Sequence, residues 1–407
     1  MIRHLLGNRS ENRSLSFQDV WGRGLDMTSA RTSSGEVVTY DSALTLSAVY
    51  AAIRLLSDNV STLKLDVLYR SQGSEQKFRP LPTWVGQMNP ELRNHEVLGQ
   101  IVTSLLLDGN AYISTLRDRT GRVVSISVLD PKTITPTMKT DEDGLSRISF
   151  QSDQAQGVEF TARDIVMVRN LLKPGQIEGV SPITAAREFL GLGLAVTKYG
   201  ASFFGNGALP GAVIEVPGQL SEVGAQQLKS SWEAVHKGAA NGSRLAVLTE
   251  GSKFSRQLSL SPEDSQFLQT KQATVQDVCR LYGVPPHLLA DSSGSTSWGS
   301  GLAEQTTAFA QFSLRPLVTR VEAALTSILR SEGIAVAYAR FDLESMRRAT
   351  SDRFDNYTKQ ISSGILSIDE VRAYENLPAL PDGKGAEHYI PLNLAPVGQE
   401  PTADDEV

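Results

Sequence analysis

The spacing of apolar residues after position 44 changes from a helical period to a strand period. A helical face is marked by Leu46, Val49, Ile53, Leu56 and Val60, which follow one another at steps of three and four. Residues 63–70 then alternate largely between apolar and polar side chains, the period of a half-buried strand. A second helical pattern covers residues 97–105, and Asn94 is its predicted cap. The sequence therefore predicts a helix, a strand and a helix in this order.

After the second helix the pattern becomes β-rich. One hairpin is predicted where residues 111–116 and 123–129 flank the polar turn RDRTGR. Another is predicted where residues 134–138 and 148–150 flank an Asp-Gly turn, and residues 165–168 form a last short strand. Clustered antiparallel strands after helices, without strict alternation of the two, predict an α+β fold.

Two long helices are predicted next, at residues 182–204 and 262–281. Each is preceded by a Ser that caps the helix and opens with Pro, a combination typical of helix N-termini. Residues 207–260, between them, carry the patterns of a short strand at 212–216, a helix containing 226–236 and a strand at 245–248. We therefore expect a helical hairpin with a compact insertion at its tip.

The first long helix has a small-sided face. It includes Gly193, Thr197, Gly200 and Ala201, and an interior glycine costs about 1 kcal/mol relative to alanine. Such a face indicates close packing, either inside one subunit or against identical neighbours, and both alternatives stay open. Lys198 and Lys271, one on each long helix, would contact phosphate groups or form salt bridges at subunit borders.

The tract that follows, VPPHLLADSSGSTSWGSGLAEQTTAFAQF, is rich in Gly and Ser. It lacks the GxxxxGK[ST] pattern of a phosphate-binding loop and has no Lys or Arg between Asp291 and Leu314. Helical periodicity resumes at Phe309, and Pro316 is expected to kink or break this helix because proline removes a backbone hydrogen bond. A strand is predicted at 336–341.

The C-terminal residues return to helix. Residues 352–362 carry one helical pattern, and Ser367 with Glu370 predicts a capping box for a helix at 368–376. The last residues, PTADDEV, form an acidic tail.

Composition narrows the class of protein. The chain has 407 residues, 40% of them hydrophobic and 21% charged, as in ordinary soluble globular proteins. No apolar run approaches the roughly 20 residues that a bilayer requires, so no membrane association is expected. The net charge of −6 gives no general attraction to nucleic acid. The single Cys279 excludes an intrachain disulfide framework, which suits a reducing cytoplasm.

Candidate chemistry is sparse. The five histidines are widely separated and form no HExxH or i,i+4 pair, so no metal site is predicted. Cys279 lies within a helical apolar pattern and is interpreted as a buried structural thiol. No motif for nucleotide binding, nucleophilic catalysis or sequence-specific nucleic-acid recognition is found. The sequence therefore predicts no enzyme activity and no cofactor.

The order of several segments resembles the portal proteins of tailed double-stranded DNA phages, in the branch typical of siphoviruses. The segments are LTLSAVYAAIRLLSDNVSTLKLDVL (44–68), LLLDGNAYI (105–113), GVSPITAA (179–186), YGASFFGNGALPGAVI (199–214), YGVPPHLLA (282–290), FSLRPLVTRVEAAL (312–325) and SGILSIDEVRAYENLP (363–378). The resemblance implies a dodecameric ring at one capsid vertex, through whose central channel DNA enters and leaves. It also implies a structural protein without catalytic residues.

The resemblance implies a division into named parts. These are an N-terminal arm (1–40), the first part of the wing (41–180), a stem helix (181–206), the clip (207–260), a second stem helix (261–283), the tunnel loop, kinked helix and second part of the wing (284–345), the crown (346–390) and an acidic flexible tail (391–407).

The resemblance also assigns hypothetical sites and partners. The Gly/Ser tract takes the place of the channel loop, with Ser292, Ser293, Ser295, Thr296, Ser297, Trp298 and Ser300. Packing between stems is assigned to Gly193, Thr197, Lys198, Gly200, Ala201 and Lys271. Expected partners are further copies of the chain, the major capsid protein or scaffold, the large terminase subunit, the head–tail connector and DNA bound without sequence specificity. The expected location is the virion, after assembly in the cytoplasm of a bacterial host.

Two other classes of function remain open from the residues. One is an oligomeric capsid or tail adaptor that passes no DNA. The other is an unrecognised hydrolase or nucleotide-dependent enzyme built on the β-rich region at 110–170.

Overall fold

The computed structural model describes most of the chain. The described residues are 31–71, 74–140, 144–155, 157–205, 262–291, 300–343, 350–375 and 377–389, with the shorter pieces 212–215, 221–224 and 253–256 and positions 226 and 230. The chain divides into two compact units, Met1–Asp342 and Leu343–Val407, and each is described by itself.

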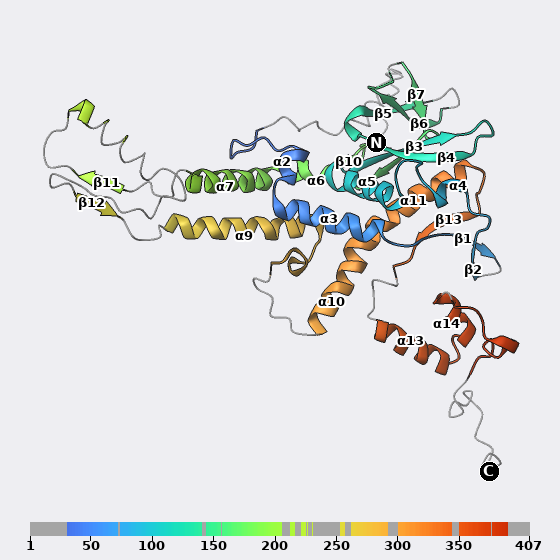
Figure 1. The fold of residues 1–407 in the computed structure, drawn as a ribbon. Coiled ribbons are helices and arrows are strands. Elements are labelled where there is room, and N and C mark those ends of the chain that lie inside the picture. The colour runs from blue at the N-terminus through green and yellow to red at the C-terminus, as the bar shows by residue number, and fades with distance from the viewer. Residues whose placement is uncertain are drawn as a thin grey trace, which may run out of the picture. The chain divides into compact units, whose positions relative to one another are not determined.

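The first unit begins with helices that pack on one another (Figure 1). The helices that precede strand β3 (Asn110–Arg117) in the sequence are α2 (Tyr40–Leu44), α3 (Ser47–Ser61), α4 (Thr83–Gly86) and α5 (Asn94–Leu107). Helix α3 packs on α5 where Ser57 meets Gly99: a Cβ on that glycine would lie 3.3 Å from Ser57 Oγ. The predicted helix over 46–60 is thus confirmed, and its apolar stripe, including Val49, Ile53 and Leu56, is buried.

The start of α5 differs from the prediction. Asn94 is the first residue of the helix, and Arg93 is the N-cap, whose backbone N–H donates to Glu96 Oε2 at 2.7 Å. The Asn94 side chain instead accepts a hydrogen bond from Met88 N at 2.8 Å and donates to Val85 O at 3.1 Å. The polar side chain therefore ties α5 to the preceding loop, because the acidic Glu96 already satisfies the helix start.

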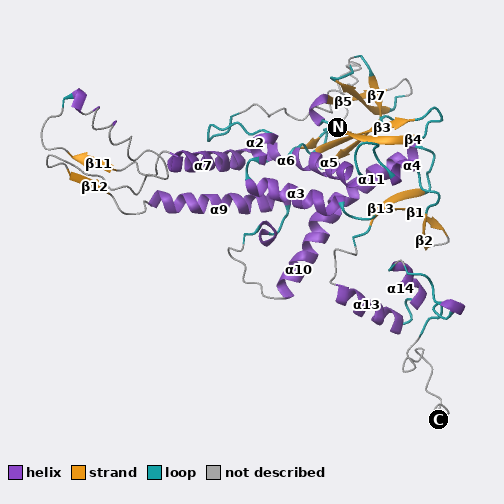
Figure 2. Cartoon of the chain, viewed as in Figure 1, coloured by secondary structure: helices purple, strands orange, loops and turns teal. Residues whose placement is uncertain are grey.

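Strands gather beside these helices in small sheets (Figure 2). Every strand pair among the described residues is antiparallel, which confirms the predicted α+β class. The strand orders are β4-β3-β8, β5-β6-β7, β13-β1-β2, β10-β9 and β11-β12. The strands are β1 (Leu65–Ser71), β2 (Ser74–Lys77), β3 (Asn110–Arg117), β4 (Val123–Leu129), β5 (Ile134–Thr140), β6 (Ser146–Ser152), β7 (Glu159–Thr161), β8 (Ile165–Arg169), β9 (Leu171–Leu172), β10 (Gly179–Val180), β11 (Ala212–Glu215), β12 (Lys253–Arg256) and β13 (Ala337–Phe341).

The predicted hairpins are confirmed as β3–β4 and β5–β6. Their two sheets share an apolar cluster in which the rings of Tyr112 and Phe150 meet edge to face, with centroids 6.0 Å apart. Ile134 and Ile165 complete the buried part of this cluster. Alternating inward-facing residues of separate hairpins thus form one core, as the strand period requires.

Strand β13, which lies at the end of the first unit's sequence, completes the sheet that contains β1 and β2. It pairs with β1, with Leu65 opposite Phe341, and α11 (Arg315–Ser331) packs along it. Glu332, just after α11, accepts hydrogen bonds from Trp84 Nε1 and Val123 N, both at 2.8 Å. The residues around position 330 are therefore fastened to both α4 and β4.

The first predicted long helix is divided in the structure. A short α6 (Pro182–Ala185) ends at Ala186, and α7 (Arg187–Gly205) follows. The Ser181 side chain caps α6, as predicted, by accepting a hydrogen bond from Thr184 N at 3.2 Å. The single helix predicted over 182–204 is therefore wrong at one point, because Ala186 has φ −99° and ψ 5° and leaves the helical conformation.

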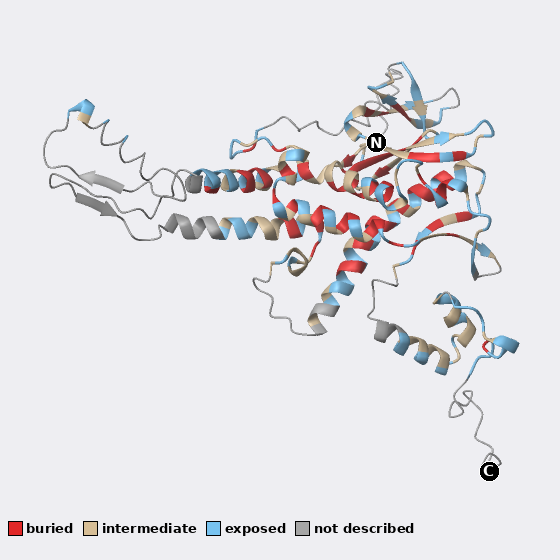
Figure 3. Ribbon diagram, viewed as in Figure 1, coloured by how far each residue is buried: buried red, intermediate tan, exposed pale blue. Residues whose placement is uncertain are grey.

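The second long helix is α9 (Pro262–Tyr282), which lies side by side with α7 (Figure 1). Buried residues concentrate where the helices meet the sheets (Figure 3). In the sequence between the two helices, β11 confirms the strand predicted at 212–216 and pairs with β12, whereas the sequence predicted the second strand of this region at 245–248. That predicted strand, and most of the predicted helix at 226–236, lie outside the described residues.

The helix after the Gly/Ser tract is continuous but irregular. Helix α10 (Ser300–Phe309) passes into a π-helical segment, η4 (Ala310–Leu314), and then into α11. Pro316 stands in the first turn of α11. The wider π turn precedes the proline, whose missing N–H and bulky ring disturb regular α-helical bonding.

The second unit contains α13 (Thr350–Ser362) and α14 (Ile368–Tyr374). The predicted capping box is confirmed: Glu370 N donates to Ser367 Oγ at 3.2 Å, and Ser367 N donates to Glu370 Oε2 at 2.8 Å. Asp369 fixes the following loop, because its N–H donates to Gly385 O and its carboxylate accepts from Leu380 N. Across the part of the chain that the structure describes, no helix has the length and apolar character needed to cross a bilayer.

Candidate inter-subunit and channel surfaces

The long helices α7 and α9 pack closely at Gly193. A Cβ on Gly193 would lie 2.8 Å from Thr274 Cγ2 of α9 and 3.5 Å from Leu46 Cδ1. Gly193 is buried within its own chain. Of the two explanations for the small face, crowding inside one subunit therefore accounts for this glycine.

A second side of α7 is covered by residues just before α2. A Cβ on Gly191 would lie 2.5 Å from Thr32 Oγ1, so the buried Thr32 sits directly on the helix backbone. Ser33 N donates to Glu188 Oε2 at 3.0 Å, and Lys198 forms an ion pair with Glu36. We call residues 31–38 the strap. Lys198 therefore has a partner in its own chain, at the strap.

The other residues predicted for stem packing are placed as follows. Gly200 is buried, whereas Thr197, Ala201 and Lys271 are exposed. Thr197 Oγ1 donates to Gly193 O within α7 at 2.8 Å. Contact with other subunits through the exposed residues stays a prediction.

Several of the segments that carry the family resemblance meet at the base of α7 and α9. Asn110 Nδ2 donates to Gly179 O at 3.2 Å, and Asn110 Oδ1 accepts from Gly179 N at 2.6 Å. Ser181 Oγ donates to Leu107 O at 2.8 Å. The segment at 105–113 is thereby bonded to the segment at 179–186, which fixes the position from which α6 and α7 start.

The base of α9 is fastened to the same place. Tyr282 OH donates to Leu106 O at 3.3 Å, and burial raises the pKa of this phenol, which keeps it protonated. Gly283, with φ +64°, ends the helix, and its carbonyl accepts a hydrogen bond from Ser313 Oγ of the π segment at 2.6 Å. The irregular turn before Pro316 is thus bonded to the end of α9.

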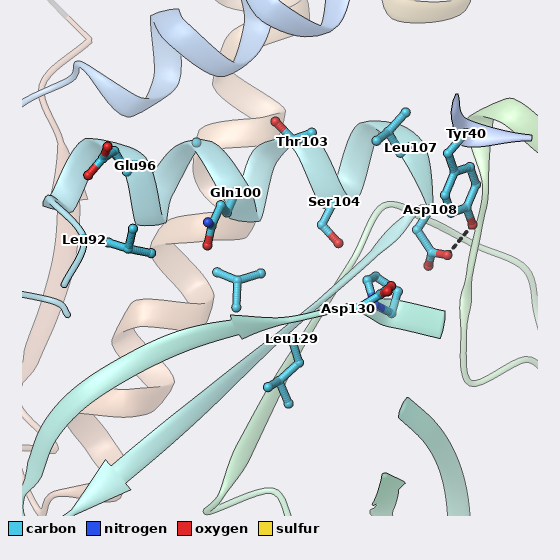
Figure 4. A pocket seen from close by; sticks show the side chains of 13 residues that line it. Tyr40, Leu92, Glu96, Gln100, Thr103, Ser104, Leu107, Asp108, Leu129 and Asp130 are labelled. Atoms are coloured by element: carbon cyan, nitrogen blue, oxygen red, sulfur yellow. Dashed lines mark hydrogen bonds between the residues drawn. The ribbon is translucent and has the colours of Figure 1, made fainter. Parts of the chain in front are cut away.

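A groove of about 580 Å³ lies between α5 and the end of β4 (Figure 4). Its acidic residues are Glu96, Asp108 and Asp130, and Tyr40 OH donates to Asp108 Oδ2 at 2.5 Å. Burial raises the pKa of Asp108, while hydrogen bonds from Tyr40 and Asn110 oppose the shift. Lys132 Nζ lies 4.7 Å from the Tyr40 ring centre. Sequence reasoning did not find this groove, because its walls come from separate segments.

Chemistry-bearing groups remain dispersed among the described residues. No set of three or more His, Cys, Asp or Glu residues in that part of the chain is arranged to hold a metal ion. Cys279 is buried, and burial raises the pKa of its thiol, as expected of a structural cysteine. The sites predicted for the channel loop, from Ser292 to Trp298, lie outside the described residues, and Ser300 is the first residue of α10.

Comparison with known proteins agrees with this architecture. The family model "Phage portal protein" matches residues 47–376. The chain is 44% identical over 384 residues to the probable portal protein of Streptomyces phage phiC31, covering 91% of this chain and 83% of that protein. It is 26% identical to the portal protein of Enterobacteria phage HK97, covering 88% and 85% of the two chains.

Solved structures show the same fold at low sequence identity. A chain from the virion of a native gene transfer agent particle superposes with a TM-score of 0.61 at 22% identity, covering 84% of this chain and 94% of that one. A crystal structure of an HK97 family phage portal protein from Corynebacterium diphtheriae gives a TM-score of 0.52 at 18% identity, covering 76% and 98%.

The mixed α/β body with its pair of long helices is therefore the fold of a viral portal, a structural rather than an enzymatic class of protein. The chain belongs to the phage portal protein family. The general role of portal proteins is to form the channel for DNA packaging at a capsid vertex.

Proposed function

We propose that copies of this chain assemble into a closed dodecameric ring whose central channel carries double-stranded DNA into and out of a capsid. The observation that carries the proposal is the packing of α7 on α9 as a close helical pair, joined at one end to the α/β body. One relative is described as the neck of a gene transfer agent particle computed with C12 symmetry, which supports a ring of this order.

The parts of the subunit follow from this proposal. Residues 41–180 and 284–345 form the wing, which the pairing of β1 with β13 supports by joining its two parts. The stem is formed by 181–206 and 261–283, the clip by 207–260 and the crown by 346–390. The division of the chain between Asp342 and Leu343 lies close to the proposed start of the crown.

The channel loop is proposed at residues 291–301. Its sequence is small, polar and without Lys or Arg, which suits a surface that touches moving DNA without holding phosphates. The overall charge of −6 is consistent with the same requirement. Trp298 either stacks against DNA or anchors the loop on the wing.

The partners of the ring are proposed from the family role. They are the large terminase subunit and the head–tail connector at the clip, and the major capsid protein or scaffold around the ring. Terminase supplies the hydrolysis of ATP, so the ring itself needs no catalytic residue. Assembly takes place in the cytoplasm of a bacterial host and ends in the virion.

The proposal is tested on the purified full-length chain. Native mass spectrometry and negative-stain electron microscopy are expected to show closed rings with a central hole. A monodisperse monomer would contradict the proposal, and a solid oligomer without a hole would favour an adaptor that passes no DNA. ATPase or nuclease activity that co-purifies with the chain and is lost only on unfolding would favour an enzyme.

The loop is tested by DNA packaging in an assembly reaction. Deletion of Asp291–Gly301 is expected to leave rings intact and to reduce the amount of packaged DNA, and Trp298→Ala separates stacking from anchoring. Unchanged packaging by the deletion variant would remove the loop from the proposed mechanism.

A further inference from the structure

One face of α7 carries exposed apolar residues. Successive residues of an α-helix are about 100° apart, so the contacts described above assign its directions. Gly193 faces α9 and Gly191 faces the strap, and Leu190 and Leu194, whose directions lie between those two, are buried. The remaining direction contains Leu192, Ala195, Val196 and Tyr199, and Leu192 is 46% and Tyr199 57% exposed. An apolar stripe of this kind indicates a packing surface.

Helix α9 has an exposed face of a different character. Thr274 faces α7, and Val278, Cys279 and Tyr282 are buried. The other side of α9, at steps of four and three, is formed by Gln269, Ala273, Gln276 and Arg280. This face is uncharged up to Arg280, and its alanine lets another helix approach closely.

The charges on the two exposed faces occur at the same level of the hairpin. The contact between Gly193 and Thr274 fixes the antiparallel register of α7 and α9. Glu188 precedes Gly193 by about as many residues as Arg280 follows Thr274, so both lie near the body. Their side chains are 54% and 71% exposed, and each also has a partner in its own chain: Glu188 lies beside Arg187 and accepts from Ser33 N, and Arg280 forms an ion pair with Asp277. One face thus ends in an acid and the other in a base.

We infer that, in the ring, the α9 face of one copy (Gln269, Ala273, Gln276, Arg280) packs on the α7 stripe (Leu192, Val196, Tyr199) of the next copy, with Arg280 opposite Glu188. The inference rests on the proposed ring. A closed ring of identical subunits uses two different, mutually complementary faces on each subunit, and these two faces meet that condition. DNA is a poor occupant of the α7 stripe, because the three residues of the stripe carry no positive charge and Glu188 at its end is acidic.

The same arrangement revises which residues contact neighbours. Gly193 and Lys198, expected from the sequence to pack between subunits, are used inside the subunit. The side chains between them on the helical surface, Leu192 and Tyr199, take that role in the inferred ring.

Exchange of charge tests the pairing of Glu188 with Arg280. Glu188→Arg and Arg280→Glu are each expected to raise the protein concentration needed for half-maximal ring assembly about tenfold, because like charges then face each other. The double variant is expected to return to within about twofold of the wild type. Arg119→Glu, an exposed position in the turn between β3 and β4 and outside both long helices, is the matched charge-inversion control and should assemble normally. A double variant no better than the single variants, or an equal defect in the control, overturns the inference.

Cysteine cross-linking tests the contact directly. Val196→Cys combined with Ala273→Cys is expected to give, under mild oxidation, a ladder of covalent multimers on a non-reducing gel. Each single variant controls for Cys279, which is buried. A double variant that stays monomeric on the gel, although it forms rings in solution, overturns the inference.

The proposed ring and the inferred contact between α7 and α9 of neighbouring copies are contradicted by different results. A wild-type chain that forms no ring overturns both the proposed function and this inference. Wild-type rings together with charge-exchange variants that assemble normally and melt at the wild-type temperature overturn the inference alone.

Discussion

Asn110 bonds to both main-chain polar groups of Gly179: its amide donates to the carbonyl and accepts from the N–H. This pair joins β3, the middle strand of the sheet β4-β3-β8, to β10, which directly precedes the N-cap of α6. Gly179 has little room for a side chain, because a Cβ there would lie 2.5 Å from Gly109 O. The segments at 105–113 and 179–186 are therefore held closely together just before α6 begins.

Asn110→Ala is expected to destabilise the first unit. The change leaves a buried N–H and a buried C=O of Gly179 without these bonds, which costs roughly 1–3 kcal/mol in free energy of unfolding. Urea denaturation measures the loss. Asn59→Ala is the control, because that side chain bonds only to Leu55 O of its own helix turn and should cost less than Asn110→Ala. Equal losses in the two variants would refute a special role for Asn110.

Gly193→Ala is expected to lower the thermal stability of the subunit. The added methyl group would meet Thr274 Cγ2 at 2.8 Å, so α7 and α9 must separate or shift, at a cost of about 1–3 kcal/mol. Thr274→Ala in the same chain should recover most of this loss by removing the opposing methyl group. Gly86→Ala is the control, since a Cβ there has no neighbour within 4 Å. Thermal melting of the wild type, Gly193→Ala, Thr274→Ala and the double variant forms a double-mutant cycle, and purely additive losses would contradict the contact.

Asp108 is expected to make stability depend on pH. Burial raises its pKa in the folded chain, so the folded state binds the proton more tightly than the unfolded state, where Asp titrates near ~3.9. The stability that the folded chain gains by binding this proton is fully present below the unfolded pKa. It is lost as the pH rises through the pKa of Asp108 in the folded chain. Melting temperatures of wild type and Asp108→Asn, measured from about pH 4 upward, should therefore diverge in favour of the variant. Parallel curves would show that the carboxyl titrates normally.

Glu332→Ala is expected to loosen the attachment of α11 to α4 and β4. Trp84 is completely buried, and its indole N–H would lose its carboxylate acceptor together with Val123 N. The loss should amount to about 2–3 kcal/mol in unfolding free energy. Equilibrium denaturation followed by tryptophan fluorescence reports the change. Glu91→Ala, an exposed position, serves for comparison and should be near neutral.

Local rules predicted many elements of the fold. The steps of three and four in α3, the hairpins β3–β4 and β5–β6, and the capping box at Ser367 all depend on residues close in sequence. The same rules gave Asn94 as a helix cap, and this was wrong because contacts to Met88 and Val85 use its side chain. They also missed the interruption at Ala186.

The sequence predicted the candidate inter-subunit and channel surfaces less well than it predicted the helices and strands. The glycines of α7 indicated close packing, but the identity of the partner depends on Thr32 and Thr274, which approach from distant segments. Asn110 and Gly179 are also far apart in the sequence, and neither an asparagine nor a glycine at these positions predicts the bond between them. Family resemblance grouped these segments in order, whereas the contacts among them required the folded chain.

The pairing of β1 with β13 has a consequence for the synthesis of the protein. Leu65 finds its partner, Phe341, only after nearly the whole first unit has left the ribosome. Contacts between such distant residues form slowly and late, because the chain loses the entropy of closing a long loop before the contacts contribute any stabilising free energy. A chain truncated before β13 therefore lacks the strand that pairs with one edge of β1. Its sheet would then consist of β1 and β2 alone, and two strands without a third are only marginally stable in water.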